Sequence, residues 1–189
     1  MRHKYETRGI VLARATAGEA NAFITIITPS LGLVRARAQG LRKSGAKLAS
    51  SLTTFTESSM VLVHGKEGWR VAGAMLQENW FARMKDDNSR IRAARVSGLL
   101  LRLVAGEEND SEFFSIISRF FKALTTLPED EQDAAEVLTV LNILTMLGLD
   151  TGKILGGSSE FEKSALAEVM KERANYIARI NRGIEASGL

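Results

Sequence analysis

The sequence contains no cysteine, and this absence excludes several kinds of site at once. Disulfide bonds, thiolate zinc sites and cysteine nucleophiles are all ruled out, and a reducing, cytoplasmic compartment is the simplest interpretation. The two histidines, His3 and His64, are too few to build a metal site by themselves. We therefore expect the protein to carry no metal ion and no other cofactor.

Long apolar runs are also missing. No stretch approaches the roughly 18 to 20 uninterrupted apolar residues that a membrane-spanning helix needs, and no apolar segment follows the polar start of the chain, Met1 to Glu6. We expect neither secretion nor membrane insertion. With 45% apolar residues among 189, the composition is that of a soluble globular protein with one large domain or two small ones.

Recognisable catalytic motifs are absent as well. Residues 40–47 superficially resemble a phosphate-binding loop, in which lysine follows the second glycine and a hydroxyl residue follows the lysine. Here Ala46 follows Gly45, and Leu48 cannot hold the magnesium ion on which nucleotide hydrolysis depends. There is no nucleophile elbow and no zinc-protease motif. We predict that the protein is not an enzyme; an enzyme with an unrecognised site remains an alternative.

The charges are divided unevenly along the chain. Met1 to Lys85 contains 13 lysines and arginines against five acids, a net charge of +8, whereas Asp86 to Leu189 contains 12 against 17, a net charge of −5. No acid occurs between Glu19 and Glu57. This pattern indicates that only the N-terminal half meets a polyanion.

The N-terminal half has the composition of strands, rich in Val, Ile, Thr and aromatic residues and interrupted by glycine-containing turns. A short helix is expected from Ala46 to Ser51, with Ser44 as its cap. Three strands, a helical insert and two more strands are the element order of a five-stranded Greek-key barrel of the OB type. The strands are predicted at residues 5–15, 21–28, 33–39, 54–64 and 69–76.

The C-terminal half has helical periodicity. Four helices are predicted, at residues 89–105, from the cap Asn109 to about 127, at 128–147, and from about 159 to 184. Gly106 is expected to end the first helix. Gly148 is expected to end the third, with Leu149 completing its C-terminal cap. The predicted apolar faces include Ile91, Ala94, Leu99 and Leu103 in the first helix and Leu166, Val169, Met170, Ile177, Ile180 and Ile184 in the last. The predicted fold is multi-domain β + α, with an OB-fold nucleic-acid-binding domain at residues 1–82 and an all-α bundle of about four helices at 83–189.

A basic surface is predicted on the third strand and the loop after it. Arg35 and Arg37 alternate with small apolar residues, so both guanidinium groups leave the same face of the sheet. The candidate nucleic-acid-binding residues are Arg35, Arg37, Arg42, Lys43 and Lys47. Because aromatic residues are few, we expect phosphate contacts, little sequence specificity and strong salt dependence. The alternative is a solvated strand edge that its charges keep unpaired.

The second predicted helix is unusually rich in phenylalanine. Phenylalanines at helical spacing are typical of a core, but the stripe here is too wide for every ring to face one direction, because neighbouring residues lie about 100° apart around a helix. Part of the stripe is therefore a candidate groove for an acidic, apolar peptide. The candidate partner-binding residues are Arg102, Phe114, Arg119, Phe121 and Lys122.

Several short motifs follow one another in the order found in a known protein family. In the N-terminal half they are Arg8-Gly-Ile-Val-Leu12, Gly18-Glu19, Ile26-Ile-Thr28, Gly32-Leu-Val34, Ala38-Gln-Gly40-Leu-Arg-Lys-Ser44 and Leu52-Thr-Thr-Phe55. In the C-terminal half they are Leu99-Leu-Leu-Arg-Leu103, Phe113-Phe114, Phe120-Phe-Lys-Ala-Leu124 and Leu144-Thr-Met-Leu-Gly-Leu149. Together, residues 8–149 resemble the bacterial recombination mediator family RecO.

The resemblance implies a cytoplasmic, nucleoid-associated bacterial protein without catalytic activity. Such a protein binds single- and double-stranded DNA, anneals complementary strands, partners RecR, and helps to load the recombinase RecA onto DNA coated by single-strand-binding protein. The acidic, Phe-ending tail of single-strand-binding protein would occupy the helical domain. Many members hold a four-cysteine zinc motif where this chain has Thr151 to Ser158, so zinc is not expected. The alternative function is an adaptor whose basic barrel face binds an acidic protein.

Overall fold

The computed structural model describes residues 3–17, 19, 21–41, 48–104, 111–153 and 161–189. Within it the chain forms two compact units. The first comprises Met1–Arg83 with Val104–Ser115, and the second comprises Met84–Leu103 with Ile116–Leu189. The two units are described separately below.

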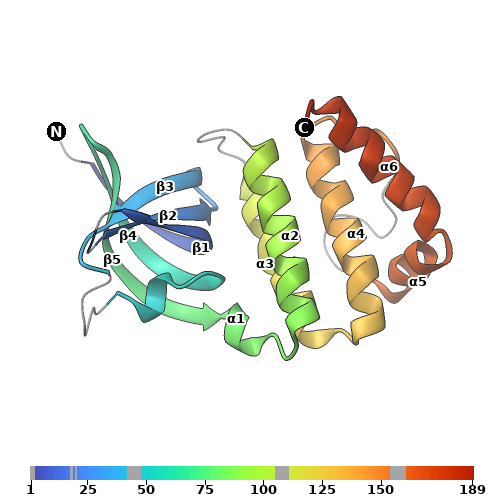
Figure 1. Ribbon diagram of the computed structural model, residues 1–189, viewed down its shortest axis with the longest axis horizontal. Coiled ribbons are helices and arrows are strands. Elements are labelled where there is room, and N and C mark those ends of the chain that lie inside the picture. Colours follow the sequence, from blue (N-terminus) through green and yellow to red (C-terminus); the bar gives the residue numbers. More distant parts are fainter. Residues whose placement is uncertain (1–2, 18, 20, 42–47, 105–110, 154–160) are drawn as a thin grey trace. The chain divides into compact units, whose positions relative to one another are not determined.

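The first unit is built on a closed five-stranded barrel, labelled in Figure 1. Its strands are β1 (His3–Ala17), β2 (Asn21–Thr28), β3 (Gly32–Ala38), β4 (Thr56–Gly65) and β5 (Gly68–Asn79), in the spatial order β1-β2-β3-β5-β4. β3 and β5 pair in parallel, and the other neighbouring pairs are antiparallel. This is the strand order of an OB-type barrel, so the predicted fold class is confirmed.

The barrel interior follows from the alternation of side chains along each strand. Val34, Ala36 and Ala38 of β3 are fully buried, whereas Arg35 between them is exposed. Closing the sheet removes its exposed edges and gives one continuous apolar core. That core comprises Val11, Ala22, Ile24, Ile26, Val34, Ala36, Ala38, Leu41, Leu52, Met60, Leu62 and Val71.

A glycine allows β1 to approach its neighbours closely. A Cβ atom at Gly9 would lie 2.5 Å from Cγ2 of Ile26 and 3.2 Å from the sulfur of Met60, so a larger residue would have to displace the barrel core. Two residues later the register of β1 against β2 shifts between Val11 and Ala13. Such a bulge increases the twist that barrel closure needs.

The connection between β3 and β4 is less helical than expected. The described part contains one turn of 3-10 helix, η1 (Ser50–Leu52), and the predicted helix start at Ala46 lies outside the described residues. The turn ends early because the hydroxyl groups of Thr56 and Ser58 both donate to the carbonyl oxygen of Ser51, at 3.1 and 2.8 Å. These bonds connect η1 directly to the start of β4.

A buried carboxylate lies at the beginning of β4. Glu57 is buried; it accepts hydrogen bonds from the guanidinium group of Arg8 and, at 3.3 Å, from the indole N–H of Trp80. Trp80 begins the short helix α1 (Trp80–Arg83), and Asn79 caps the start of this helix by accepting a hydrogen bond from the backbone N–H of Ala82 on its side-chain oxygen. The charge is therefore compensated by partners from both ends of the barrel sequence.

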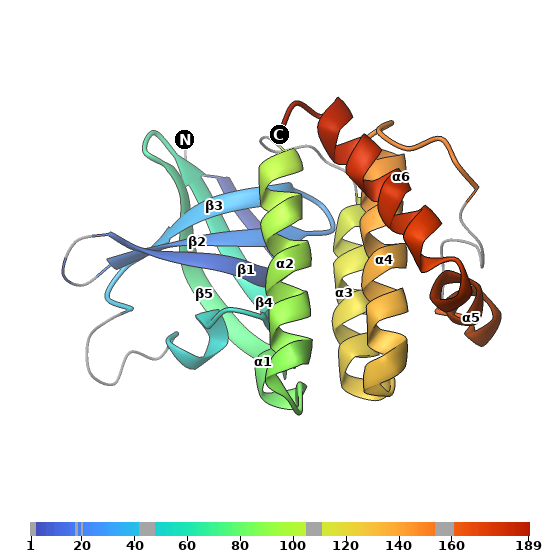
Figure 2. The same cartoon turned by 45° about the vertical axis from the view of Figure 1, so that its right-hand side comes forward.

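The other helices are α2 (Asp87–Leu103), α3 (Ser111–Thr126), α4 (Glu129–Met146), α5 (Lys163–Lys171) and α6 (Arg173–Ala186). In Figures 1 and 2, α5 and α6 lie against α4. About four helices were predicted for the bundle at residues 83–189, and the described chain has five there. The difference comes from the last predicted helix, which is divided at Glu172 into α5 and α6.

The buried face of α2 differs from the predicted one. Ser89, Ala93, Val96 and Leu100 are buried, whereas Ile91 is 51% exposed and Ala94 is exposed. The inward stripe is therefore rotated relative to the predicted face, and only Leu99 of the predicted set is buried. In the last helical region Met170 was likewise placed wrongly on the apolar face, because it is exposed.

The end of α4 follows the sequence closely. Gly148 has a φ of +70°, its N–H donates to the carbonyl of Thr145 at 3.0 Å, and the N–H of Leu149 donates to the carbonyl of Leu144 at 2.8 Å. These two bonds define a Schellman cap. The predicted helix end at Gly148 and the closing role of Leu149 are both confirmed.

Two ion pairs connect α6 to the rest of the helical unit. Arg173 donates to Asp133 of α4 at 2.7 and 3.2 Å, and Arg179 donates to Asp150 at 3.2 and 2.5 Å. The hydrogen bond from its arginine partner lowers the pKa of each aspartate below the ordinary value of 3.8. Gly152 leaves room for this contact, since a Cβ there would lie 2.3 Å from the guanidinium group of Arg179.

Candidate nucleic-acid interface

β3 presents arginines on the outer face of the barrel. Arg35 is exposed and Arg37 is half-buried, on the opposite side of the strand from the buried alanines. The outward direction predicted from the alternating pattern is therefore confirmed. Their role in binding stays a prediction.

The parallel pairing of β3 with β5 adds an arginine that the sequence analysis missed. Arg37 is directly opposite Arg70 in the register of the two strands, and neighbouring strands lie about 4.8 Å apart. Like charges at opposite positions of neighbouring strands are unfavourable, and an anion bound near both would relieve their repulsion. The signal was available, because an OB-type strand order places the third strand beside the fifth.

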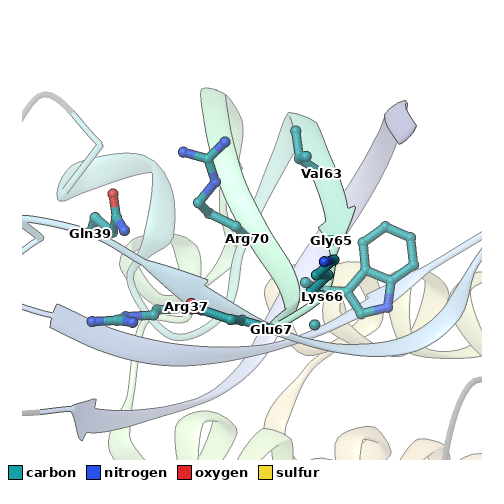
Figure 3. A pocket seen from close by; sticks show the side chains of 9 residues that line it. Arg37, Gln39, Val63, Gly65, Lys66, Glu67 and Arg70 are labelled. Carbon is teal, nitrogen blue, oxygen red and sulfur yellow. The ribbon is translucent and has the colours of Figure 1, made fainter. Parts of the chain in front are cut away.

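These side chains surround a hollow of about 460 Å³ at the end of the β4–β5 hairpin. Figure 3 shows Arg37 and Arg70 on neighbouring strands, with Lys66 and Glu67 in the hairpin turn. Three cations and one acid therefore border the same space. Its lining residues are Arg37, Gln39, Val63, Gly65, Lys66, Glu67, Gly68, Trp69 and Arg70.

An aromatic ring orients the remaining arginine. The guanidinium carbon of Arg35 lies 4.6 Å from the ring centroid of Phe23 on β2, and Phe23 is directly opposite Arg37 in the β2–β3 register. A cation over an aromatic face keeps its charge while losing part of its mobility. Arg35 is thus held on the outer face beside Arg37.

The barrel arginines differ from the helical ones in their partners. Within the described residues, Arg35, Arg37, Lys66 and Arg70 form no ion pair, whereas the arginines of the helical unit that face α4 are paired with Asp133 or Glu136. We call Arg35, Arg37, Lys66 and Arg70 the cationic face. Its charge is available to an external anion. The other predicted cations, Arg42, Lys43 and Lys47, lie outside the described residues.

The phenylalanines of α3 do not line the predicted groove. Phe121 is fully buried and Phe114 is buried, so both are core side chains, as the alternative interpretation of the stripe expected. Arg119 is partly exposed and Lys122 is exposed. The groove prediction is wrong for the two rings because α3 is covered on more than one side.

An apolar hollow of about 650 Å³ lies elsewhere, among α2, α4 and α6. Its apolar residues include Val96, Leu99, Val140, Ile177, Ile180 and Ile184. Arg102, which the sequence analysis had grouped with α3, borders this hollow and is exposed. Two further arginines at the rim, Arg95 and Arg173, are bonded to Glu136 and Asp133.

Comparison with known proteins identifies the barrel. Residues 1–74 match the family described as recombination protein O, N terminal. The chain is 36% identical over 184 residues to the DNA repair protein RecO of Roseiflexus sp., an alignment that covers 95% of this chain and 60% of that relative. The chain is similar to RecO proteins over most of its length, and its barrel matches the RecO N-terminal domain. A RecO protein of Dehalococcoides mccartyi is 27% identical over 150 residues, covering 77% of this chain and 57% of the relative.

The match to the RecO N-terminal domain includes the whole cationic face. It extends from β1 into β5 and so contains Arg35, Arg37, Lys66 and Arg70. The chain spans about 60% of the length of the Roseiflexus RecO protein.

The described residues contain neither a candidate metal site nor a candidate membrane-spanning helix. Within the described residues, no three His, Cys, Asp or Glu side chains are grouped closely enough to hold a metal ion. None of the described helices has both the length and the apolar character that a bilayer crossing requires. Residues 154–158, where many RecO members carry part of the zinc motif, lie outside the described chain.

Proposed function

We propose that this protein acts in DNA repair and recombination by binding DNA on the cationic face of its barrel. The observation that carries the proposal is the pair Arg37 and Arg70, which are opposite each other in the register of neighbouring strands and have no carboxylate partner in the described chain. The similarity to RecO proteins supports the same conclusion, since these relatives are named DNA repair proteins. The protein binds its substrate without transforming it chemically.

Binding is driven by the release of counterions from the phosphate backbone. Each protein cation that replaces a condensed counterion on the DNA adds to the affinity. Because such a cation contacts a phosphate and not a base, the protein has little sequence preference. Neutralising the phosphates of one strand also lowers the repulsion that a second, complementary strand meets. The cationic face therefore favours annealing of two single strands.

The finer role is that of a recombination mediator. The protein anneals single-stranded DNA and helps to load the recombinase RecA onto DNA coated by single-strand-binding protein, together with RecR, in the bacterial cytoplasm. Double-stranded DNA binds the same face through its phosphates. The similarity to RecO proteins supports these partners, and the unpaired charges support the DNA contact.

Strand annealing by the purified protein tests the proposal. Two complementary oligonucleotides, one carrying a fluorophore and the other a quencher, should pair faster in the presence of the protein at low salt, and the acceleration should disappear in high salt because the phosphate contacts are screened. Anisotropy of the labelled strand measures binding in the same samples. Absence of binding at low salt would overturn the proposal.

A second candidate function involves the hollow among α2, α4 and α6. Its apolar floor and the exposed Arg102 suit a short acidic peptide that ends in an aromatic residue. The acidic, Phe-ending tail of single-strand-binding protein has this chemistry. We therefore place the tail in this hollow and not along α3, because the rings of α3 are buried.

Peptide binding distinguishes the two locations. We expect Arg102→Glu to lower the affinity for a labelled Phe-ending acidic peptide by about fivefold, which corresponds to about 1 kcal/mol of binding free energy. The matched control is Lys122→Glu on α3, which makes the same change of charge and should leave the peptide affinity unchanged. If Lys122→Glu lowered the peptide affinity more than Arg102→Glu does, the peptide would bind along α3 instead.

A further inference from the structure

Phe23 on β2 lies on the outer face of the barrel and contacts a charged side chain there. Its chain neighbours Ala22 and Ile24 are fully buried in the core, so the alternation along the strand directs the Phe23 ring outward, where it is half-buried. The guanidinium carbon of Arg35 lies 4.6 Å from the centroid of this ring. At that distance the ring attracts the positive charge electrostatically. Arg35 has no ion pair within the described residues, so no carboxylate there competes with the ring.

The contact between Arg35 and Phe23 runs diagonally across two strands. In the register of β2 and β3, Arg35 is opposite Thr25. Phe23 is opposite Arg37. Arg35 therefore reaches over a side chain that lies two residues from its own partner on β2, a distance within the reach of long side chains. The diagonal contact brings the charge of Arg35 to the position of Phe23.

The position of Phe23 lies in the same row of the sheet as two further arginines. Phe23 on β2 is opposite Arg37 on β3, and Arg37 is opposite Arg70 on β5. Neighbouring strands are about 4.8 Å apart, so this row crosses three strands within about 10 Å. Because opposite residues point to the same face of a sheet, all three side chains leave the barrel on its outer side. With Arg35 over Phe23, each of the three positions has a guanidinium charge.

The row of charges ends on both sides at an apolar residue. Beyond β5 the next residue of the row is Val63 on β4, and beyond β2 it is Ala15 on β1. Along the third strand, the residues two positions before and two positions after the pair of arginines are Leu33 and Gln39, which carry no charge. The positive charge of the row therefore extends across the strands of the barrel and not along a single strand.

We propose that Phe23 is a positioning residue for DNA binding, which holds the Arg35 guanidinium group in line with the arginines of β3 and β5. The phosphate backbone of a bound strand then lies along this row and crosses the strands of the barrel. The inference rests on the proposed DNA binding and adds to it the direction of the bound strand and the residue that orients Arg35.

Repulsion between the guanidinium groups is the reason that the ring is needed. Three like charges within about 10 Å repel one another, so Arg35 would turn away from its neighbours if nothing attracted it to the row. The ring supplies that attraction without neutralising the charge. An arginine that is already in place also loses less conformational freedom when a phosphate binds, which raises the affinity.

Substitution of the ring tests the positioning role in the whole chain. Phe23→Leu keeps an apolar side chain but removes the ring, and we expect it to lower the affinity for a labelled single-stranded oligonucleotide by about threefold in an anisotropy titration. Phe23→Tyr keeps a ring and should remain close to the wild type. In an Arg35→Gln background, Phe23→Leu should cause no further loss, because the charge that the ring positions is already gone. Equal losses in both backgrounds would overturn the proposal.

Pentafluorophenylalanine at position 23 separates the attraction of the charge from packing. Fluorination keeps a ring of similar size but reverses its quadrupole, so the ring no longer attracts a cation. We expect about the same threefold loss of affinity, with a melting temperature close to that of the wild type. Unchanged affinity would overturn the proposal, and this variant decides the question if Phe23→Leu does not fold.

Wild-type binding distinguishes failure of the positioning role from failure of the proposed function. If the wild type binds no oligonucleotide at low salt, the DNA-binding function itself is rejected. If the wild type binds and the variants without an attracting ring bind equally well, only the positioning role of Phe23 is rejected.

Discussion

Replacing Arg37 and Arg70 with glutamate is expected to weaken binding to single-stranded DNA by on the order of 100-fold at about 0.1 M salt. The two substitutions remove two phosphate contacts and place two negative charges where the backbone of the strand would lie. Fluorescence anisotropy with a labelled oligonucleotide measures the loss. The free energy of unfolding should change little, because neither guanidinium group has an ion-pair partner to lose within the described residues.

The control for this experiment must change the total charge equally. Lys171 and Arg182 are exposed in the helical unit and form no ion pair in the described chain, so the double substitution of these residues with glutamate has the same effect on net charge. We expect it to leave the affinity within a few-fold of the wild type. Equal losses in the two double variants would show that total charge, and not the cationic face, determines binding.

Replacing Arg179 with alanine should destabilise the helical unit by about 3 kcal/mol, the cost of removing one partner from a largely buried ion pair. Asp150 is mostly buried and accepts two bonds from this guanidinium group. Arg179 also donates to the carbonyl of Lys153 at 3.2 Å. Its loss therefore removes the counterion of Asp150, to which the hydroxyl group of Thr145 still donates at 3.3 Å. Thermal unfolding monitored by helical circular dichroism measures the change, and Arg182→Ala on the same helix is the control.

The same pair makes a prediction about pH. Because the bond from Arg179 lowers the pKa of Asp150 in the folded state, the contribution of the pair to stability is complete above the ordinary pKa of 3.8 and is lost as the pH falls through the lowered value. Acid should therefore lower the melting temperature of the wild type more than that of Arg179→Ala. If the melting temperatures of the two proteins differed by the same amount at pH 7 and at pH 3, this account would be contradicted.

The parts of the fold that the sequence predicts are those set by short-range patterns. Alternation of Val34, Ala36 and Ala38 with arginines determines which face of β3 is buried, and a glycine that can adopt positive φ determines where α4 ends. Both depend on residues that are neighbours in the chain. The order of strands and loops then suffices to recognise an OB-type barrel.

The parts that were missed depend on contacts between distant residues. Arg70 belongs to the candidate site only because β5 pairs in parallel with β3. This pairing places Arg70 opposite Arg37, which is 33 residues earlier in the chain. The inward face of α2 is set by the neighbours that cover it, and these leave Ile91 outside. The burial of Phe121 similarly depends on the elements that surround α3. Helical periodicity shows which residues share a face but not how many faces are covered.

The salt dependence of DNA binding tests the central claim most directly. If about four cations of the barrel contact phosphates, the logarithm of the affinity for a single-stranded oligonucleotide should fall with the logarithm of salt concentration with a slope of about −3. The Arg37→Glu and Arg70→Glu double variant should give a slope that is smaller by about 1.4. A slope near zero for the wild type, or the same slope for both proteins, would contradict the assignment of the cationic face as the DNA-binding surface.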